Sequence, residues 1–140
     1  MDIYVHGCVE QDGKIVLLLR GGNASYFSDH YGLIGGKVEQ HESIKSALIR
    51  ELQEEINIVA DVDSMQLIHC LSFKNEKGME LLNMMFKISS WSGDIVNKEK
   101  EKHPEMQWFA VDSLPHNIIP RHRQAIELAY RGILYSEDGW

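Results

Sequence analysis

Three glutamates in one short segment have the types and spacing to bind a metal ion. Glu51, Glu54 and Glu55 stand in one segment, where helical geometry would project their side chains within an arc of about 75–100°. Like charges at such spacings destabilise a helix by about 0.2–0.5 kcal/mol per pair, and the one favourable pair, Arg50 with Glu54, does not offset this. Clustered carboxylates beside a phosphate group are typical ligands of Mg²⁺. The cluster therefore predicts a magnesium site.

The residues around these glutamates match a longer motif. Residues 36–58 read GKVEQHESIKSALIRELQEEINI. They agree with the Nudix box, Gly-x5-Glu-x7-Arg-Glu-(apolar)-x-Glu-Glu-x-Gly-(apolar), at every specified position except the second glycine. With average residue usage, chance produces such a match on the order of once in a hundred thousand sequences. A solvated, acid-rich surface helix is the competing interpretation, and the spacing disfavours it. The chain therefore resembles the Nudix (MutT-type) pyrophosphohydrolases.

Three positions depart from the family's pattern. Asn57 stands where the box has glycine, at the expected helix end, where a left-handed backbone is needed and asparagine is the next best residue. Ile34 stands where a proline often precedes the two glycines, and His41 where a glycine often precedes Glu42. The last two departures concern loop geometry, so they bear on substrate fit more than on chemistry.

The resemblance implies a fold and a set of functional residues. The fold is an α/β/α sandwich, a mixed β-sheet between helices, with residues 1–140 as a single Nudix hydrolase domain. One to three Mg²⁺ ions, for which Mn²⁺ can substitute, would bridge the diphosphate of the substrate. Glu51 occupies a place that serves either as a ligand or as the general base, and Arg50 would orient Glu54 or a neighbouring carboxylate. The implied catalytic residues are Glu51, Glu54 and Arg50, and the implied metal ligands are Gly36, Glu51, Glu54 and Glu55.

Further residues are candidates for contacts with the substrate or the metal. Arg20 is assigned to the phosphates or ribose and Lys37 to a phosphate. Tyr26 and Phe27 are candidates for stacking on the base, and Trp108 is a candidate for lining the pocket. The competing interpretation makes them a solvated strand end, an exposed loop lysine and ordinary hydrophobic cover. In this fold, the loop corresponding to residues 94–104 can reach over the site and lend another carboxylate. The candidates for this acid are Glu99, Glu101 and Glu105.

Hydrophobic patterning predicts the elements that position these residues. Strands are expected at residues 3–9, 14–20, 31–34, 65–74, 79–91 and 106–111, and a closing helix at 120–134. The box helix should begin near Ser43, which would serve as its N-cap. It should bury an apolar stripe made of Ile44, Ala47, Leu48, Ile49, Leu52 and Ile56. Three aromatic residues are expected in the core rather than in a base-binding pocket: Phe73, Phe86 and Trp91.

Composition limits the class of function. The net charge of −7 argues against a general nucleic-acid binder, which would present a basic face. No apolar run approaches the roughly 20 residues of a membrane span and no signal peptide is evident, so a cytoplasmic location without a membrane partner is expected. Cys8 and Cys70 lack paired spacing and are expected to be buried and reduced. The oligomeric state is open between a monomer and the homodimer that many relatives form.

The resemblance implies hydrolysis of a nucleoside diphosphate linked to another group. Lys74 stands where ADP-ribose enzymes often have proline, and Asn75 and Glu76 stand where dinucleoside polyphosphate enzymes have tyrosine. The expected substrate is therefore a nucleoside triphosphate, either ordinary or oxidised, cleaved to a monophosphate and pyrophosphate. ADP-ribose or a nucleotide sugar is the alternative substrate. A catalytically silent nucleotide-binding module is disfavoured because all three box acids of the helix are present.

Overall fold

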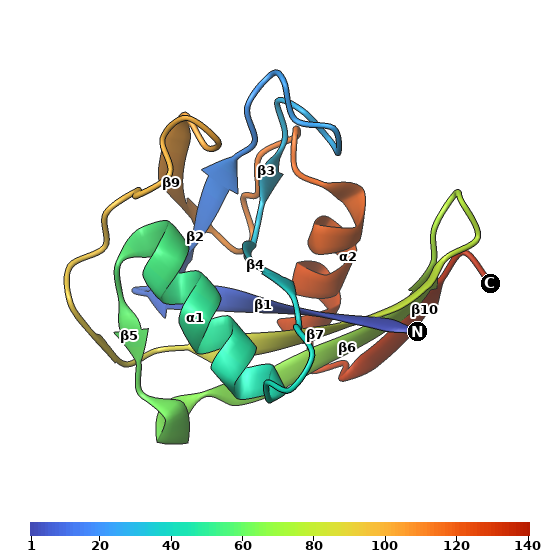
Figure 1. The fold of residues 1–140 in the computed structure, drawn as a ribbon, viewed down its shortest axis with the longest axis horizontal. Helices are drawn as coiled ribbons and strands as arrows, with labels where there is room; N and C mark the ends of the chain where they lie inside the picture. Colours follow the sequence, from blue (N-terminus) through green and yellow to red (C-terminus); the bar gives the residue numbers. More distant parts are fainter.

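The computed structural model describes residues 1–140, in which a mixed β-sheet carries one helix on each face (Figure 1). The strand order is β10-β6-β7-β1-β2-β3, with β4 paired to β1 and β9 paired to β2. The strands are β1 (Asp2–Gln11), β2 (Lys14–Leu19), β3 (Tyr31–Gly32), β4 (Ile34–Lys37), β6 (Gln66–Lys74), β7 (Glu80–Ile88), β9 (Glu105–Ala110) and β10 (Tyr135–Asp138). The helices are α1 (Ile44–Ile56) and α2 (Pro120–Ala129). This arrangement confirms the predicted α/β sandwich.

The sheet contains both parallel and antiparallel pairs. β1 runs parallel to β7 and β6 parallel to β10, and the other pairs are antiparallel. A turn at Asp12 and Gly13 joins β1 to β2, and both residues have positive φ. A separate short pair, β5 (Val59–Ala60) and β8 (Trp91–Ser92), lies outside this sheet, and a 3-10 turn, η1 (Val62–Ser64), follows β5. The parallel β1–β7 pair places residues far apart in the sequence on neighbouring strands.

Side chains of the central strands alternate between two hydrophobic clusters, one under each helix. Val16 and Leu18 of β2 join the cluster that contains α1, whereas Ile15 and Leu17 join the cluster that contains α2. All four are buried, so β2 is covered on both faces. In β1, Val5 and Val9 face the α1 cluster and Cys8 the α2 cluster. This alternation is the two-residue period of a strand.

Both ends of α1 have the local structure that the sequence predicts. Ser43 is the N-cap, and its hydroxyl accepts a hydrogen bond from the backbone N–H of Ser46 at 3.2 Å. Asn57 is the C-cap with φ 68° and ψ 26°, a left-handed conformation. His41, at the other glycine position of the family, also has φ 68°. The family's glycine preference at both positions therefore reflects a backbone conformation that this chain adopts with other residues.

The C-terminal region differs from the prediction. α2 ends at Ala129 rather than at residue 134, because Gly132 has φ 78° and the chain reverses there. The following residues form β10, which pairs in parallel with β6 from Tyr135 to Asp138. This strand was not predicted, since its sequence, YSED, has no apolar alternation. Because Asp138 aligns with Phe73 and Asp2 with Leu81, the two chain ends lie at the same end of the sheet (Figure 1).

The charged loop between β8 and β9 is held along the C-terminal end of α1. The backbone N–H groups of Val96 and Lys98 donate to the carbonyls of Ile56 and Glu55 at 3.0 Å each. At the far end of the loop, the N–H of Gly21 donates to the carbonyl of Lys102 at 3.0 Å. The loop therefore joins the end of the box helix to the loop after β2 and passes beside Glu55.

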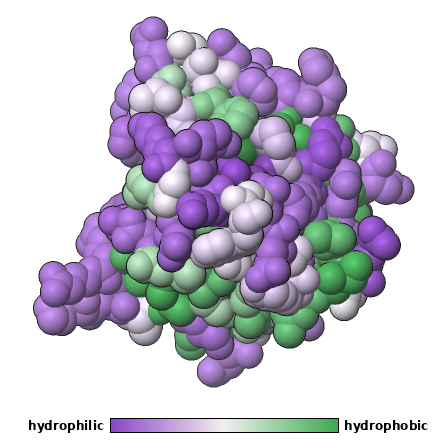
Figure 2. Space-filling model, turned by 90° about the vertical axis from the view of Figure 1, so that its right-hand side faces the viewer, coloured by the Kyte–Doolittle hydropathy of each residue, from purple (hydrophilic) through white to green (hydrophobic).

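The surface and the two cysteines complete the description of the fold. The face shown in Figure 2 is mainly hydrophilic, with hydrophobic residues exposed mostly in its lower part. Cys8 is buried as predicted, whereas Cys70 is only half-buried. Neither helix has the length and hydrophobicity needed to cross a lipid bilayer.

Candidate active site

The glycine strand β4 meets the last turn of α1 at a buried carboxylate. Glu55 is only 9% exposed, and its Oε2 accepts a hydrogen bond from the backbone N–H of Gly35 at 3.1 Å. Gly35 has φ 153°, and a Cβ atom there would collide with the backbone of Val5 and His6 in β1. Glycine is therefore required at position 35 for β4 to lie against β1 while its N–H points at Glu55.

The surroundings of Glu55 disfavour a negative charge in the protein alone. Burial, followed by the nearby charge of Glu51, raises the pKa of Glu55 to about 8. Burial also raises the pKa of Glu51. Glu55 therefore lies among other carboxylates without a basic side chain of its own to pair with, which is the electrostatic condition of a metal site.

Gly36 allows the backbone of β4 to approach Glu51 closely. A Cβ atom at position 36 would lie 2.5 Å from Oε1 of Glu51, and 3.0 Å from its Cδ. Since real Cβ atoms are not found at such distances, any other residue would displace the Glu51 carboxylate. The box glycine is therefore explained by contact with the first helical glutamate.

A Gly36→Ala variant should lose activity while it keeps its fold. The added methyl group pushes the Glu51 carboxylate away, and a displacement of about 1 Å at a reacting group can cost roughly 10²-fold in rate. We expect a loss of kcat/KM of this order, with a melting temperature within a few degrees of wild type. Gly22→Ala, where the new Cβ has ordinary contacts, is the matched control and should be fully active. Wild-type kcat/KM in the Gly36→Ala variant would contradict this role of Gly36.

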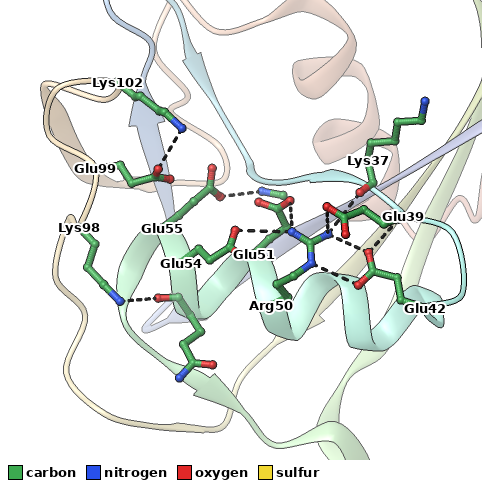
Figure 3. A network of polar contacts seen from close by, with 12 residues as sticks. Lys37, Glu39, Glu42, Arg50, Glu51, Glu54, Glu55, Lys98, Glu99 and Lys102 are labelled. Carbon is green, nitrogen blue, oxygen red and sulfur yellow. Dashed lines mark hydrogen bonds and ion pairs between the residues drawn. The ribbon is translucent and has the colours of Figure 1, made fainter.

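Arg50 holds the carboxylates of the helix and of the preceding loop together (Figure 3). Its Nε and NH2 groups donate to the two oxygens of Glu42 at 3.2 and 2.8 Å. Its NH1 group donates to Oε1 of Glu51 at 3.0 Å and lies 3.5 Å from Glu54. These hydrogen bonds lower the pKa of Glu42. Arg50 therefore contacts Glu42, Glu51 and Glu54 together and restricts the orientation of their carboxylates.

The charged loop brings two more potential ligands to Glu55. Oxygen atoms of Glu55 and Glu99 and a ring nitrogen of His103 lie within 4.8 Å of one another. The Nδ1 atom of His103 is enclosed and has no hydrogen-bond partner, although buried polar atoms are almost always paired. Burial lowers the pKa of His103, so its ring is neutral and has a lone pair to offer. A histidine with an unpaired ring nitrogen, grouped with one buried and one half-buried carboxylate, fits a divalent cation.

Of the three predicted loop acids, only Glu99 lies in this group. The carboxylate of Glu105 instead accepts a hydrogen bond from the hydroxyl of Tyr31 at 2.6 Å. Glu101 is exposed at the tip of the loop. Figure 3 shows Glu99 directed toward Glu55, with the Lys102 ammonium 3.1 Å from its carboxylate. The fold therefore distinguishes three acids that the sequence could not.

A cavity of about 520 Å³ opens beside these groups. One part of its wall contains Gly35, Gly36, Glu55 and His103. The rest of the wall comes from β1, β2, β7, the turn between β6 and β7, and the start of α2. It includes apolar or aromatic side chains of Leu18, Tyr26, Leu33, Phe73, Met79, Leu81 and Ile119, and polar side chains of His6, Arg20, Asn83, Arg121 and His122. The cavity thus joins an acidic end to a larger space lined by apolar, aromatic and polar side chains, as ligand sites commonly do.

The residues predicted to contact substrate fall in different places. Arg20 lines the cavity, and its Nε donates to the carbonyl of Tyr26 at 2.6 Å. Lys37 forms an exposed ion pair with Asp2 at 3.3 Å, and its side chain points away from the carboxylates (Figure 3). Phe27 packs edge-on against Tyr26, and neither it nor Trp108 lines the cavity. Trp108 is exposed on β9, while Phe109 packs against the α2 cluster.

Several cavity residues were missed from the sequence. Phe73 lines the cavity rather than the core, with the Arg121 guanidinium 4.6 Å from its ring centroid. His103 was not among the predicted site residues, although its place in the loop expected to cover the site was a usable signal. His6, Asn83 and His122 come from three separate elements, so no local pattern connects them.

Comparison with known proteins places this geometry in context. The NUDIX domain family matches residues 3–129. An ADP-ribose pyrophosphatase of Methanocaldococcus jannaschii is 27% identical over 81% of this chain and 64% of its own length. A CTP pyrophosphohydrolase of Escherichia coli is 48% identical over 41% of this chain and 42% of its own. The chain thus spans less than two thirds of these curated relatives.

A solved structure supports the same conclusion at the level of the fold. The crystal structure of a MutT NUDIX hydrolase from Burkholderia pseudomallei is 26% identical and superimposes with a TM-score of 0.81, over 90% of this chain and 95% of that one. The family match over most of the chain agrees with the glycine strand, the acidic helix and the cavity described above. This chain belongs to the NUDIX domain family.

Proposed function

We propose that this protein is a Mg²⁺-dependent pyrophosphohydrolase that cleaves a nucleoside triphosphate to a nucleoside monophosphate and pyrophosphate. The observation that carries the proposal is the buried Glu55 carboxylate, grouped with Glu99 and His103 at one end of a 520 Å³ cavity. A triphosphate needs positive charge where it binds, and this end of the cavity is arranged to acquire it from a cation. The remainder of the cavity, lined by apolar side chains together with a few polar ones, is suited to a nucleoside.

The donor set fits a divalent cation. Nudix hydrolases generally use such a metal, and the residues that would hold it here are Glu51, Glu54, Glu55, the Gly36 carbonyl, Glu99 and His103. Bound there, the metal would neutralise the phosphate charge, polarise the phosphoryl oxygens and lower the pKa of the attacking water. The mainly carboxylate set suits Mg²⁺, and the His103 nitrogen favours Mn²⁺ as an effective substitute.

The chain's own groups supply the rest of the reaction. Water attacks a phosphorus atom of the substrate, the bridging P–O bond breaks, and the proton of the water passes to the Glu51 carboxylate. Burial raises the pKa of Glu51, which makes it a more effective base than an exposed glutamate. Arg50 keeps that carboxylate in place through the 3.0 Å hydrogen bond. Among the basic side chains that line the cavity, Arg20 is proposed to contact a phosphate.

The named relatives support a nucleotide substrate without agreeing on one. Relatives include the CTP pyrophosphohydrolase, an oxidized purine nucleoside triphosphate hydrolase of Danio rerio (29% identical) and the ADP-ribose pyrophosphatase. A triphosphate is proposed here because Lys74, Asn75 and Glu76 stand where ADP-ribose and dinucleoside polyphosphate enzymes often have other residues. The net charge of −7 disfavours a nucleic-acid substrate.

A substrate panel tests the proposal. Purified protein with Mg²⁺ is incubated with the eight common triphosphates, an oxidised guanine triphosphate, ADP-ribose, a diadenosine polyphosphate and a nucleotide sugar. Turnover of at least one triphosphate, and its loss after chelation of the metal, is expected. Turnover only of ADP-ribose or the sugar would overturn the substrate class, and no turnover with retained nucleotide binding would favour a binding module.

The stability of the metal-free protein should depend on pH through Glu55. Its pKa is about 8 in the folded chain and near 4.5 in the unfolded chain. The folded state therefore holds an extra proton between these values, so this contribution to stability is complete below about pH 4.5 and is lost as pH rises toward 8. The free energy of unfolding should fall by up to about 1.4 kcal/mol per pH unit in that interval.

Chemical denaturation in EDTA from pH 5 to 8.5 measures this dependence. The Glu55→Gln variant should have a flatter profile, because glutamine does not titrate. Added Mg²⁺ should restore stability mainly at the alkaline end, where the carboxylate is ionised. Identical pH profiles for the wild type and the variant would show that Glu55 titrates normally.

A further inference from the structure

Three polar side chains from separate elements form the floor of the cavity. They are His6 of β1, Asn83 of β7 and His122 of α2. Each is at most 8% exposed, and all three line the cavity. His6 lies between the others: it is hydrogen-bonded to Asn83 at 2.7 Å, and its ring centroid is 4.7 Å from that of His122. Buried polar groups facing a cavity select for ligands that can pair with them.

The hydrogen bond to Asn83 fixes the tautomer of His6. The carboxamide oxygen of Asn83 can only accept, so Nδ1 of His6 carries the proton and donates. Burial lowers the pKa of His6, which keeps the ring neutral. Its Nε2 atom therefore has a lone pair and acts as an acceptor.

The opposite tautomer is fixed at His122. The backbone N–H of Leu33 donates to Nδ1 of His122 at 3.0 Å, so Nδ1 has no proton. Burial lowers the pKa of this ring well below its usual value, so it too is neutral. Its Nε2 atom therefore carries the proton and acts as a donor.

The remaining group on the floor is the amide nitrogen of Asn83. The oxygen of this side chain is occupied by His6, so its two N–H bonds are left to donate. The three free atoms are therefore the amide nitrogen of Asn83 and the Nε2 atoms of His6 and His122. None of them has a hydrogen-bond partner in the protein. Each keeps some access to solvent, because Nδ1 of His103 is the only side-chain nitrogen or oxygen that is both enclosed and unpaired. They therefore open into the cavity in the order donor (Asn83), acceptor (His6), donor (His122).

We propose that this floor binds the imide edge of a nucleobase, which offers carbonyl, N–H and carbonyl in a row. The inference rests on the proposed function, because it names the base of that substrate. Uracil and thymine present this edge on their pairing face. An 8-oxopurine with a 6-carbonyl, such as 8-oxoguanine, presents it between O6 and O8. Cytosine, adenine and unmodified guanine have no acceptor–donor–acceptor edge and would leave at least one floor group unpaired.

The location of the floor suits a nucleotide whose base binds there while its phosphates reach the acidic end of the cavity. His6 pairs with Gly35 across β1 and β4, and the N–H of Gly35 contacts Glu55. The floor and the carboxylates therefore belong to one continuous wall of the cavity. Apolar side chains of Leu33 and Ile119 line the same space and would cover an uncharged ring.

Binding of nucleoside monophosphates in the absence of metal tests the inference separately from catalysis. By calorimetry, dUMP, dTMP and 8-oxo-dGMP should bind at least about 10-fold more tightly than dCMP, dAMP and dGMP, as expected for multiple hydrogen bonds to a base edge. Preference among the three imide ligands identifies the natural source, a pyrimidine or an oxidised purine. Equal binding of dCMP and dTMP would overturn the proposal.

The Asn83→Asp variant provides a second test. The new carboxylate replaces the donor with an acceptor and favours a protonated His6, so the floor becomes acceptor, donor, donor. This order complements cytosine, and the preference for imide bases over cytosine should fall by at least 10-fold. Asn23→Asp is the matched control, since Asn23 is exposed and does not line the cavity, and it should keep the wild-type preference. An unchanged preference in a folded Asn83→Asp variant would contradict the proposal.

Results from the two experiments separate the two proposals. Turnover of all triphosphates at similar kcat/KM would leave the proposed hydrolysis intact and overturn base selection by the floor. Selective binding of imide monophosphates without any turnover would support base selection by the floor and overturn the proposed hydrolysis.

Discussion

A Glu55→Gln variant should lose nearly all turnover while it folds normally. Glutamine keeps the size of the side chain and an oxygen for the Gly35 N–H at 3.1 Å, but it removes the buried negative charge. Without that charge, the cation that neutralises the substrate phosphates loses a ligand. Losses of about 10³-fold in kcat are typical when one such electrostatic group is removed from an active site. Steady-state kinetics with saturating Mg²⁺ measures the loss.

The same variant should be at least as stable as the wild type without metal. The pKa of Glu55 is raised because burial disfavours its charge, so replacing it with a neutral group relieves this cost at alkaline pH. Glu127→Gln, on the exposed side of α2, is the control and should have wild-type kcat and melting temperature. A Glu55→Gln variant that retained a tenth or more of wild-type kcat would contradict the assignment of Glu55 as a metal ligand.

An Arg50→Lys variant should lose activity although it keeps the positive charge. The guanidinium contacts both oxygens of Glu42 and one oxygen of Glu51, and a lysine ammonium cannot make these hydrogen bonds in the same geometry. Groups that orient metal ligands are typically worth about 10–100-fold in metal affinity or activity. We expect a decrease of this size in kcat/KM, together with weaker Mg²⁺ binding by calorimetry.

Metal affinity separates a positioning role from a purely structural one. Loss of hydrogen bonds to charged groups should also destabilise the protein by about 1.5–3 kcal/mol. If stability alone fell, with Mg²⁺ affinity and kcat/KM unchanged, Arg50 would serve only to anchor the loop before α1. Arg123→Lys, which alters an exposed pair with Glu127 on α2, is the matched control and should affect neither metal binding nor turnover.

The box helix and its ends could be predicted because their signals are local. The spacing of Glu51, Glu54 and Glu55 and the caps at Ser43 and Asn57 depend on residues within a few turns of one helix. The continuous apolar run of residues 14–20 likewise predicted the strand that the structure shows as β2. In each case the sequence neighbours are also the spatial neighbours, so periodicity carries the structural information.

The cavity and the C-terminal strand could not be predicted, because they depend on contacts between distant residues. His6 and Asn83 meet only because β1 pairs in parallel with β7, and His122 joins them from a helix that packs later in the chain. Glu99 lies near Glu55 and Glu101 does not, and this difference depends on how the loop lies along α1. β10 is polar and relies on its pairing with β6, so its sequence resembles that of a loop.

The most direct test of the central claim is product analysis with isotopically labelled water. A nucleoside triphosphate from the active panel is incubated in H₂¹⁸O with Mg²⁺, and again with EDTA, and the products are analysed by mass spectrometry. The account predicts a nucleoside monophosphate and pyrophosphate, with one ¹⁸O atom in only one of them, and no product in EDTA. Release of orthophosphate and a nucleoside diphosphate, or turnover in EDTA at the rate seen with Mg²⁺, would contradict it.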